Sequence, residues 1–210
     1  MYNGELINDF CILGDTTKLV ERAQINICRL YEAAQDIIVP RGFKLLSAVA
    51  NVKELILTDD FLKDLAAGDE LFDTLPMFCN LSDLSVEWSF DPVSFRIFSM
   101  ILRRSPRLRS LSFSEEFDSF PQNERDGLLD PVPSCFVMEQ ISLRIDNTDR
   151  GFEDQLFVIG LLLKTACVLE ELEVRYMQDF MDASFLEDSI GNLPVGSESC
   201  QNWFIDTSFK

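Results

Sequence analysis

The chain contains no histidine in its 210 residues. Histidine is the usual general base of nucleophilic triads and the commonest metal ligand, so its absence argues against Ser-His-Asp and Cys-His schemes and most metal centres. The sequence also lacks a glycine-rich phosphate-binding loop, and carboxylates such as Asp59 and Asp60 form no catalytic motif. We therefore expect a non-enzyme without cofactor or metal, and a hydrolase built on scattered acids is the weaker alternative.

Basic side chains are few. The chain has 18 Lys and Arg against 36 Asp and Glu, which gives a net charge of −18. Phosphate backbones and anionic lipid surfaces repel a chain this acidic, so neither nucleic acid nor a membrane is an expected partner. Solubility is the simplest explanation for the acidity.

Long apolar runs are absent as well. No uninterrupted apolar stretch approaches the roughly 18 residues of a membrane span. Residues 1–5 show neither the basic nor the apolar region of a secretory signal. The six cysteines lie far apart with no Cys-x-x-Cys pair, so we expect them to be reduced, buried, small apolar side chains. These features predict an intracellular protein, cytoplasmic or nuclear.

What the sequence does contain is a recurring phrase of apolar residues. Its pattern is apolar, two residues, apolar, any residue, apolar, and six copies begin at residues 20, 52, 81, 108, 138 and 169. A further copy, Ile7-xx-Phe10-x-Ile12, is possible near the N-terminus. The spacings of 32, 29, 27, 30 and 31 residues match the period of a strand-plus-helix repeat. The sequence therefore predicts an α/β fold, a leucine-rich-repeat-like solenoid with parallel strands on one face and helices on the other.

Side chains alternate between the two faces of a strand, so each phrase assigns its residues to a face. The last two apolar positions, for example Leu55 and Leu57, are expected to turn toward the helices. The opposite face is the predicted partner-binding surface, with Glu54, Ile56, Asp83, Ser85, Glu87, Ser112, Ser142, Arg144, Glu173 and Arg175. The same surface is expected to carry Thr58, Ser110, Ser114, Gln140 and Glu171. Small serines flanked by acids suit a partner with basic side chains, although a solvated sheet face without a partner is the alternative.

Other elements can be placed from periodicity and from breaker residues. Strands are predicted at 7–13, 23–27, 54–57, 140–144, 171–175 and 201–205, and another ends near Trp88. Helices are predicted within 28–39, where Pro40 would stop the helix, and at 43–49, 61–67, 92–104, 156–167 and 179–188. Residues 114–134 are acidic and rich in turn formers, which predicts the longest loop.

A cluster of arginines accompanies the end of the helix predicted at 92–104. Arg103, Arg104, Arg107 and Arg109 could form a binding patch, or they could complement the negative end of the helix dipole. We favour the second interpretation, because cations at a helix C-terminus need no ligand to explain them.

Several longer phrases resemble those of plant F-box/leucine-rich-repeat proteins that carry a C-terminal FBD module. Residues 132–136 leading to 141–143, then 153–154, a helix ending at 163–166, and 168–172 look like the FBD module. Residues 193–201 are similar to its closing segment, although the family commonly has Arg where Val195 stands. Upstream, 18–23, 51–55 and 75–81 resemble the repeat phrases of the same proteins.

The resemblance implies a leucine-rich-repeat region at 1–130 and an FBD-like region at 131–210, continuous with the repeat stack. It implies a protein–protein interaction module like the substrate-recognition part of an SCF-type ubiquitin ligase receptor. Members of the family begin with an F-box that docks a Skp-type adaptor, and a repeat strand at 7–13 would leave no room for one. We therefore expect no Skp-type adaptor, and the alternative is a stand-alone or truncated repeat protein that binds or shields a target.

Overall fold

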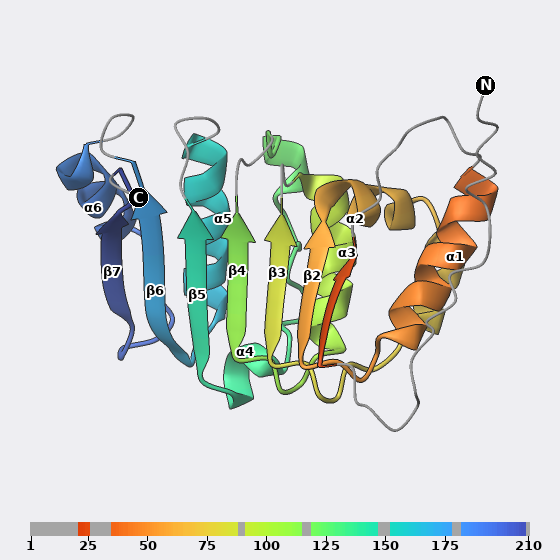
Figure 1. The fold of residues 1–210 in the computed structure, drawn as a ribbon. Coiled ribbons are helices and arrows are strands. Elements are labelled where there is room, and N and C mark those ends of the chain that lie inside the picture. Colours follow the sequence, from red (N-terminus) through yellow and green to blue (C-terminus); the bar gives the residue numbers. More distant parts are fainter. Residues whose placement is uncertain are drawn as a thin grey trace.

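The computed structural model describes residues 21–25, 35–87, 91–114, 119–146, 152–177 and 182–208, and the strand expected at 7–13 lies outside them. These residues form a seven-stranded sheet in which the strands follow one another in sequence order. Every neighbouring pair is parallel, as Figure 1 shows. The strands are β1 (Arg22–Ile25), β2 (Glu54–Thr58), β3 (Asp83–Glu87), β4 (Ser110–Ser114), β5 (Ile141–Asp146), β6 (Leu169–Tyr176) and β7 (Gln201–Asp206).

Helices occupy the connections between these strands. They are α1 (Gln35–Ala48), α2 (Asp59–Ala66), α3 (Pro92–Arg103), α4 (Cys135–Met138), α5 (Phe152–Thr165) and α6 (Ala183–Gly191), with the 3₁₀ helices η1 (Asp69–Thr74) and η2 (Gln122–Glu124). In the described part of the chain, no helix is both long and apolar enough to cross a membrane.

The order of the strands explains where the helices lie. Crossovers between parallel strands are right-handed, so strands added one after another in the same direction send each crossover to the same side of the sheet. In Figure 1, α2, α3 and α5 lie behind the strands, and the face in front carries none of these helices. We call that front face the open face. The predicted α/β class with parallel strands is confirmed.

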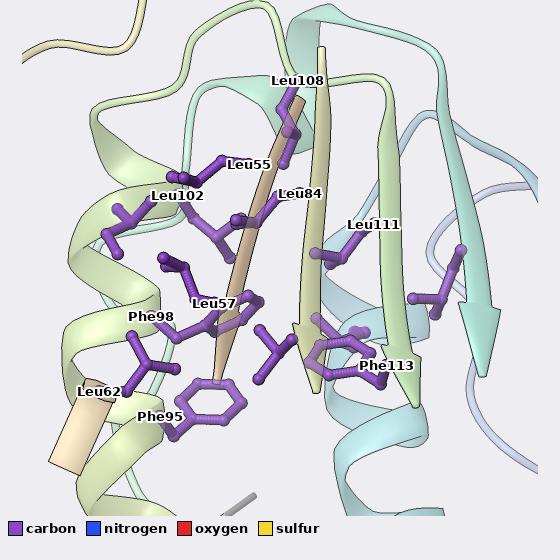
Figure 2. Close-up of a cluster of buried hydrophobic side chains, with 14 of the residues drawn as sticks. Leu55, Leu57, Leu62, Leu84, Phe95, Phe98, Leu102, Leu108, Leu111 and Phe113 are labelled. Carbon is purple, nitrogen blue, oxygen red and sulfur yellow. The ribbon is translucent and has the colours of Figure 1, made fainter. Parts of the chain in front are cut away.

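The core lies between the sheet and the helices. One row of paired inward side chains is Leu55, Leu84, Leu111, Leu143 and Leu172, and a second is Leu57, Val86, Phe113, Ile145 and Val174. All ten are at most 2% exposed. Figure 2 shows the part of these rows on β2, β3 and β4 pointing toward Phe95, Phe98 and Leu102 of α3. The predicted inward positions are therefore confirmed.

The helix α3 forms where the sequence predicts it. The Asp91 side chain accepts a hydrogen bond from the Ser94 backbone N–H at 2.8 Å, and Pro92 stands in the first turn. Its inner stripe is buried, and the Phe98 ring lies 5.4 Å from the Phe113 ring of β4 in an edge-on arrangement. Aromatic pairs of this geometry contribute about 0.5–1.5 kcal/mol beyond their burial.

Within the described residues 35–48, a single helix runs through the position where a helix was expected to stop. α1 contains Pro40 in its interior, so the prediction that Pro40 stops the helix is wrong. A proline inside a helix costs about 3 kcal/mol. Val39, Phe43 and Leu46 share one side of α1 and are at most 5% exposed. Burying each such side chain contributes about 1.5–3 kcal/mol, so the continuous apolar stripe outweighs the proline.

The fifth copy of the phrase is misplaced by two residues. Leu111 pairs with Leu143, so this copy begins at Gln140, which precedes β5, and not at Met138. Met138 is 80% exposed and ends α4, a short helix that the pattern did not predict. A shift of two residues keeps each side chain on its face. Ile141 and Leu143 are therefore still buried, as expected.

The connection between β4 and β5 is anchored to the helical layer. Phe120 and Leu129 are 1% and 4% exposed. The Phe120 ring lies 6.0 Å from that of Phe95 and 5.7 Å from that of Phe157, and its backbone N–H donates to Asp154 Oδ1 at 2.8 Å. The region predicted as a loop thus contributes side chains to the core.

The described cysteines are free thiols in different surroundings. Cys135 is buried, Cys200 is half-buried, and Cys79 and Cys167 are exposed. The expectation of burial is therefore right for Cys135 and wrong for Cys79 and Cys167. Burial raises the pKa of the Cys135 thiol to about 12, which keeps it protonated and unreactive.

The two faces of the sheet should respond differently to truncation. Leu84→Ala and Leu111→Ala each leave a cavity between the sheet and the helices, and we expect each to lower the free energy of unfolding by about 2–5 kcal/mol. Ser85→Ala and Ser112→Ala remove a hydroxyl from the open face, and we expect about 1 kcal/mol or less. Urea unfolding of the four variants measures this, and equal losses at Leu and Ser would contradict the face assignment.

Candidate interaction surface

The strand pairing places three rows of side chains on the open face. The central row consists of Gln24, Ile56, Ser85, Ser112, Arg144, Glu173 and Trp203. The row toward the strand starts consists of Arg22, Glu54, Asp83, Ser110, Ser142, Glu171 and Gln201. The row toward the strand ends contains Thr58, Glu87, Ser114, Asp146, Arg175 and Ile205. Of the residues predicted for this face, all but Gln140 lie in these rows.

Serines form the middle of the face. We call this group the serine strip: Ser85, Ser110, Ser112, Ser114 and Ser142 of β3, β4 and β5. The hydroxyl oxygens of Ser85 and Ser112 are 2.6 Å apart and share a hydrogen bond. Because serine side chains are short, they protrude little from the sheet. Another chain can therefore come close to the backbone at the serine strip.

Carboxylates occupy β2 and β3, on one side of the serine strip. We call them the acidic end: Glu54, Asp83 and Glu87. Arg22 pairs with Glu54 at 3.3 Å, the Ser82 hydroxyl donates to Asp83 at 2.6 Å, and the Gln24 amide donates to Glu87 at 3.2 Å. Only one of these three contacts brings a positive charge, so the acidic end remains negative.

Ile56 requires a correction. It lies on the open face by its pairing but is only 5% exposed, and Thr58 beside it is fully buried. The side chains of Gln24 on β1 and Glu87 on β3 are hydrogen-bonded to each other, so their contact spans β2 on the face that carries Ile56 and Thr58. Ile56 is therefore not available to a partner. At the acidic end, a partner can contact only the carboxylates.

Two arginines converge on one glutamate on the other side of the serine strip. The Glu173 carboxylate accepts from Arg144 Nε at 3.1 Å and from Arg175 Nε at 2.6 Å. Partial burial alone would raise the pKa of Glu173, but the hydrogen bonds and charges of the two arginines outweigh it and lower that pKa. The charge of Glu173 is thus balanced by the two arginines, whereas Glu171 on the same strand is exposed to solvent.

The face continues onto β7 with residues that the sequence reasoning did not assign to it. Trp203 pairs with Glu173 and Ile205 with Arg175, so both side chains lie on the open face, where they are 52% and 40% exposed. The strand itself was predicted at 201–205. The alternation of Trp203, Phe204 and Ile205 could have assigned the faces, but the inward Phe204 is as apolar as its neighbours and hid the signal.

The four arginines of the predicted cluster lie in two different surroundings. Arg103 donates to the backbone carbonyls of Asp130 and Pro131 at 2.7 and 3.1 Å. Arg104 donates to the Leu75 carbonyl at 2.6 Å. These two arginines hold neighbouring loops at the end of α3, which agrees with a structural explanation.

The other two arginines line a depression of about 400 Å³ below the strand starts. Its lining is Glu21, Asn51, Lys53, Asn80, Ser82, Arg107 and Arg109. Lys53 is already paired with Glu21 at 2.8 Å and Arg109 with Glu139 at 3.2 Å. An anion would have to displace these carboxylates, so the depression is a weaker anion-binding site than its basic residues suggest.

A group of charged side chains also lies between α2 and α3. Lys63 Nζ pairs with Asp59 at 2.5 Å and with Asp91 at 3.3 Å, and the Ser94 hydroxyl donates to both carboxylates. These hydrogen bonds and charges outweigh burial and raise the pKa of Lys63. The carboxylates of Asp59 and Asp91 are therefore occupied by contacts between α2 and α3. Within the described ranges, no group of three or more His, Cys, Asp or Glu could hold a metal ion.

These features define the class of the protein. It is an α/β protein with a single parallel sheet and one open polar face. The chain is similar to an FBD-associated F-box protein of Arabidopsis thaliana, with 28% identity over 188 residues that cover 85% of this chain and 39% of that protein. It therefore spans about two fifths of that relative's length. The similarity supports the relation to plant F-box/FBD proteins that the phrases indicated. No family model and no solved structure matches.

The Glu173 cluster generates a pH dependence with a definite sign. A carboxylate whose folded pKa is lowered stabilises the fold above its unfolded pKa, and this contribution disappears as the pH falls through the folded pKa. We expect Glu173→Gln to reduce the free energy of unfolding by about 1 kcal/mol or less at pH 7. We expect the difference from wild type to disappear once the pH falls below the lowered pKa of Glu173.

Urea unfolding at a series of pH values measures this difference. Glu171→Gln, which makes the same substitution two residues away on the exposed surface of β6, is the matched control and should stay close to wild type throughout. A Glu173→Gln difference that does not change with pH would contradict the role assigned to the two arginines.

Proposed function

We propose that the chain is a leucine-rich-repeat-like solenoid that binds a protein target through its open face and performs no catalysis. The observation that carries the proposal is the open face itself. It presents the acidic end, the serine strip and the arginines as a continuous polar surface over consecutive strands. The helices that could have covered it lie on the other side. A sheet face of this size and chemistry suits recognition of another chain.

The similarity to the Arabidopsis FBD-associated F-box protein supports a narrower version of the proposal. We infer that the chain corresponds to the substrate-recognition part of a plant F-box receptor of an SCF-type ubiquitin ligase. The repeating spacing of 29 residues from Leu55 to Leu84 and 27 from Leu84 to Leu111 supports the solenoid. The acidic end favours a target that presents basic side chains.

Site-specific photocrosslinking in plant cells tests where the target binds. A photoreactive amino acid at Ser112, in the centre of the serine strip, should crosslink a defined protein. The same amino acid at Val93, which is 48% exposed on α3 in the helical layer, should not. Recovery of the same protein from both positions, or from Val93 alone, would contradict binding at the open face.

Charge reversal tests the chemistry of the target. We expect Asp83→Lys/Glu87→Lys to reduce binding of the crosslinked protein about tenfold or more, because two attractive contacts become repulsive. Glu70→Lys/Glu187→Lys is the matched control, since it makes the same charge change at exposed residues of the helical layer. Affinities are measured with the purified target by calorimetry, and equal affinities of the two double variants would contradict a basic target.

A further inference from the structure

The last strand carries an apolar patch on an otherwise polar face. Trp203 and Ile205 are 52% and 40% exposed, and their pairing places them next to Glu173 and Arg175 on the open face. β7 is the last strand in the order of the sheet. Large apolar side chains exposed together are more informative than scattered ones, because water contact with them is unfavourable. We call Trp203 and Ile205 the apolar end.

The apolar end and the acidic end lie at opposite sides of the serine strip. Asp83 and Glu87 are on β3, and Trp203 and Ile205 are on β7. The serine strip between them is low, and Glu173 beside Trp203 is neutralised by two arginines. The face is therefore polarised along the direction that crosses the strands, negative at one end and apolar at the other.

The separation of the two ends sets the length of chain that can contact both. The step from β3 to β7 is four strand spacings, and at about 4.8 Å each this is about 19 Å. An extended chain advances about 3.3 Å per residue, so about six residues span that distance. A segment crossing the strands can thus place a cation over the acidic end and an apolar group against the apolar end.

We propose that the open face binds an extended segment of the target that lies across the strands. One or two Lys or Arg residues of the segment contact Asp83 and Glu87. An aromatic or branched aliphatic residue, about six positions away, packs against Trp203 and Ile205. This proposal rests on the proposed function and adds to it the class of ligand and the direction in which it lies. A second copy of this chain fits less well, because a net charge of −18 on each copy opposes their association.

Peptide selection against the full chain tests this ligand class. A phage library of random peptides of about sixteen residues is selected on immobilised wild-type protein, and enriched peptides are synthesised and measured by fluorescence anisotropy. We expect the enriched sequences to carry a basic residue and an apolar residue about six positions apart. Failure to enrich any sequence, or enrichment of an alternating motif typical of a strand added along the edge of β7, would overturn the proposal.

Variants at the acidic end and at the apolar end measure how much each contributes to peptide binding. Trp203→Ser and Asp83→Lys/Glu87→Lys should each weaken the enriched peptides about tenfold or more. Phe185→Ser is the matched control, because it removes a comparably exposed aromatic ring from α6, and it should bind like wild type. Thermal unfolding first establishes that all variants keep the wild-type midpoint.

The outcomes distinguish this proposal from the one on which it rests. Peptides that respond to the acidic-end variant but not to Trp203→Ser would overturn the crossing segment and leave the open face as the binding surface. Peptides that respond to neither would overturn both. Self-association of the wild type that Trp203→Ser abolishes, seen by light scattering, would assign the apolar end to a second copy and overturn the proposal.

Discussion

Parallel pairing of each strand with the next builds both the core and the open face of this protein. A single strand-and-helix unit has only a few inward strand positions and one helix stripe, and it cannot bury these by itself. Pairing aligns Leu55, Leu84 and Leu111 in one row, so each leucine is covered by its neighbours on the adjacent strands and by the helices behind. The core is therefore shared along the sheet and does not belong to any one unit.

The same pairing creates the surface available for function. Since every strand is added on the same side of the one before, the crossovers return on one face and the other face remains open. Its polar side chains are held by contacts between neighbouring strands, such as the shared hydrogen bond of Ser85 and Ser112 and the bond from Arg144 to Glu173. Arg175, on the same strand as Glu173, adds a further bond to that carboxylate. A surface ordered in this way loses little conformational freedom on binding, which favours recognition of another chain.

Much of the fold could be predicted because the sheet imposes a simple periodicity. Alternation within each phrase correctly separated Leu84 from Ser85 and Leu111 from Ser112. The errors lie where an interaction other than strand alternation determines the local structure. Pro40 stays within α1 because the apolar stripe of that helix is continuous. The fifth phrase was placed two residues early because Met138 is apolar but ends a short exposed helix, and periodicity cannot distinguish an exposed methionine from a buried one.

The strands, their inward leucines and the excess of acidic side chains can be read from the amino-acid sequence, because they follow from local alternation and from composition. Which outward residues are accessible, and which of them contact one another, depends on how the strands are arranged in the folded protein. The hydrogen bond between Gln24 and Glu87 spans β2, on which Ile56 is buried, while pairing with Glu173 brings Trp203 onto the open face. Both results join residues far apart in the chain. Side-chain contacts across strands depend on the pairing of whole elements, which no local pattern contains.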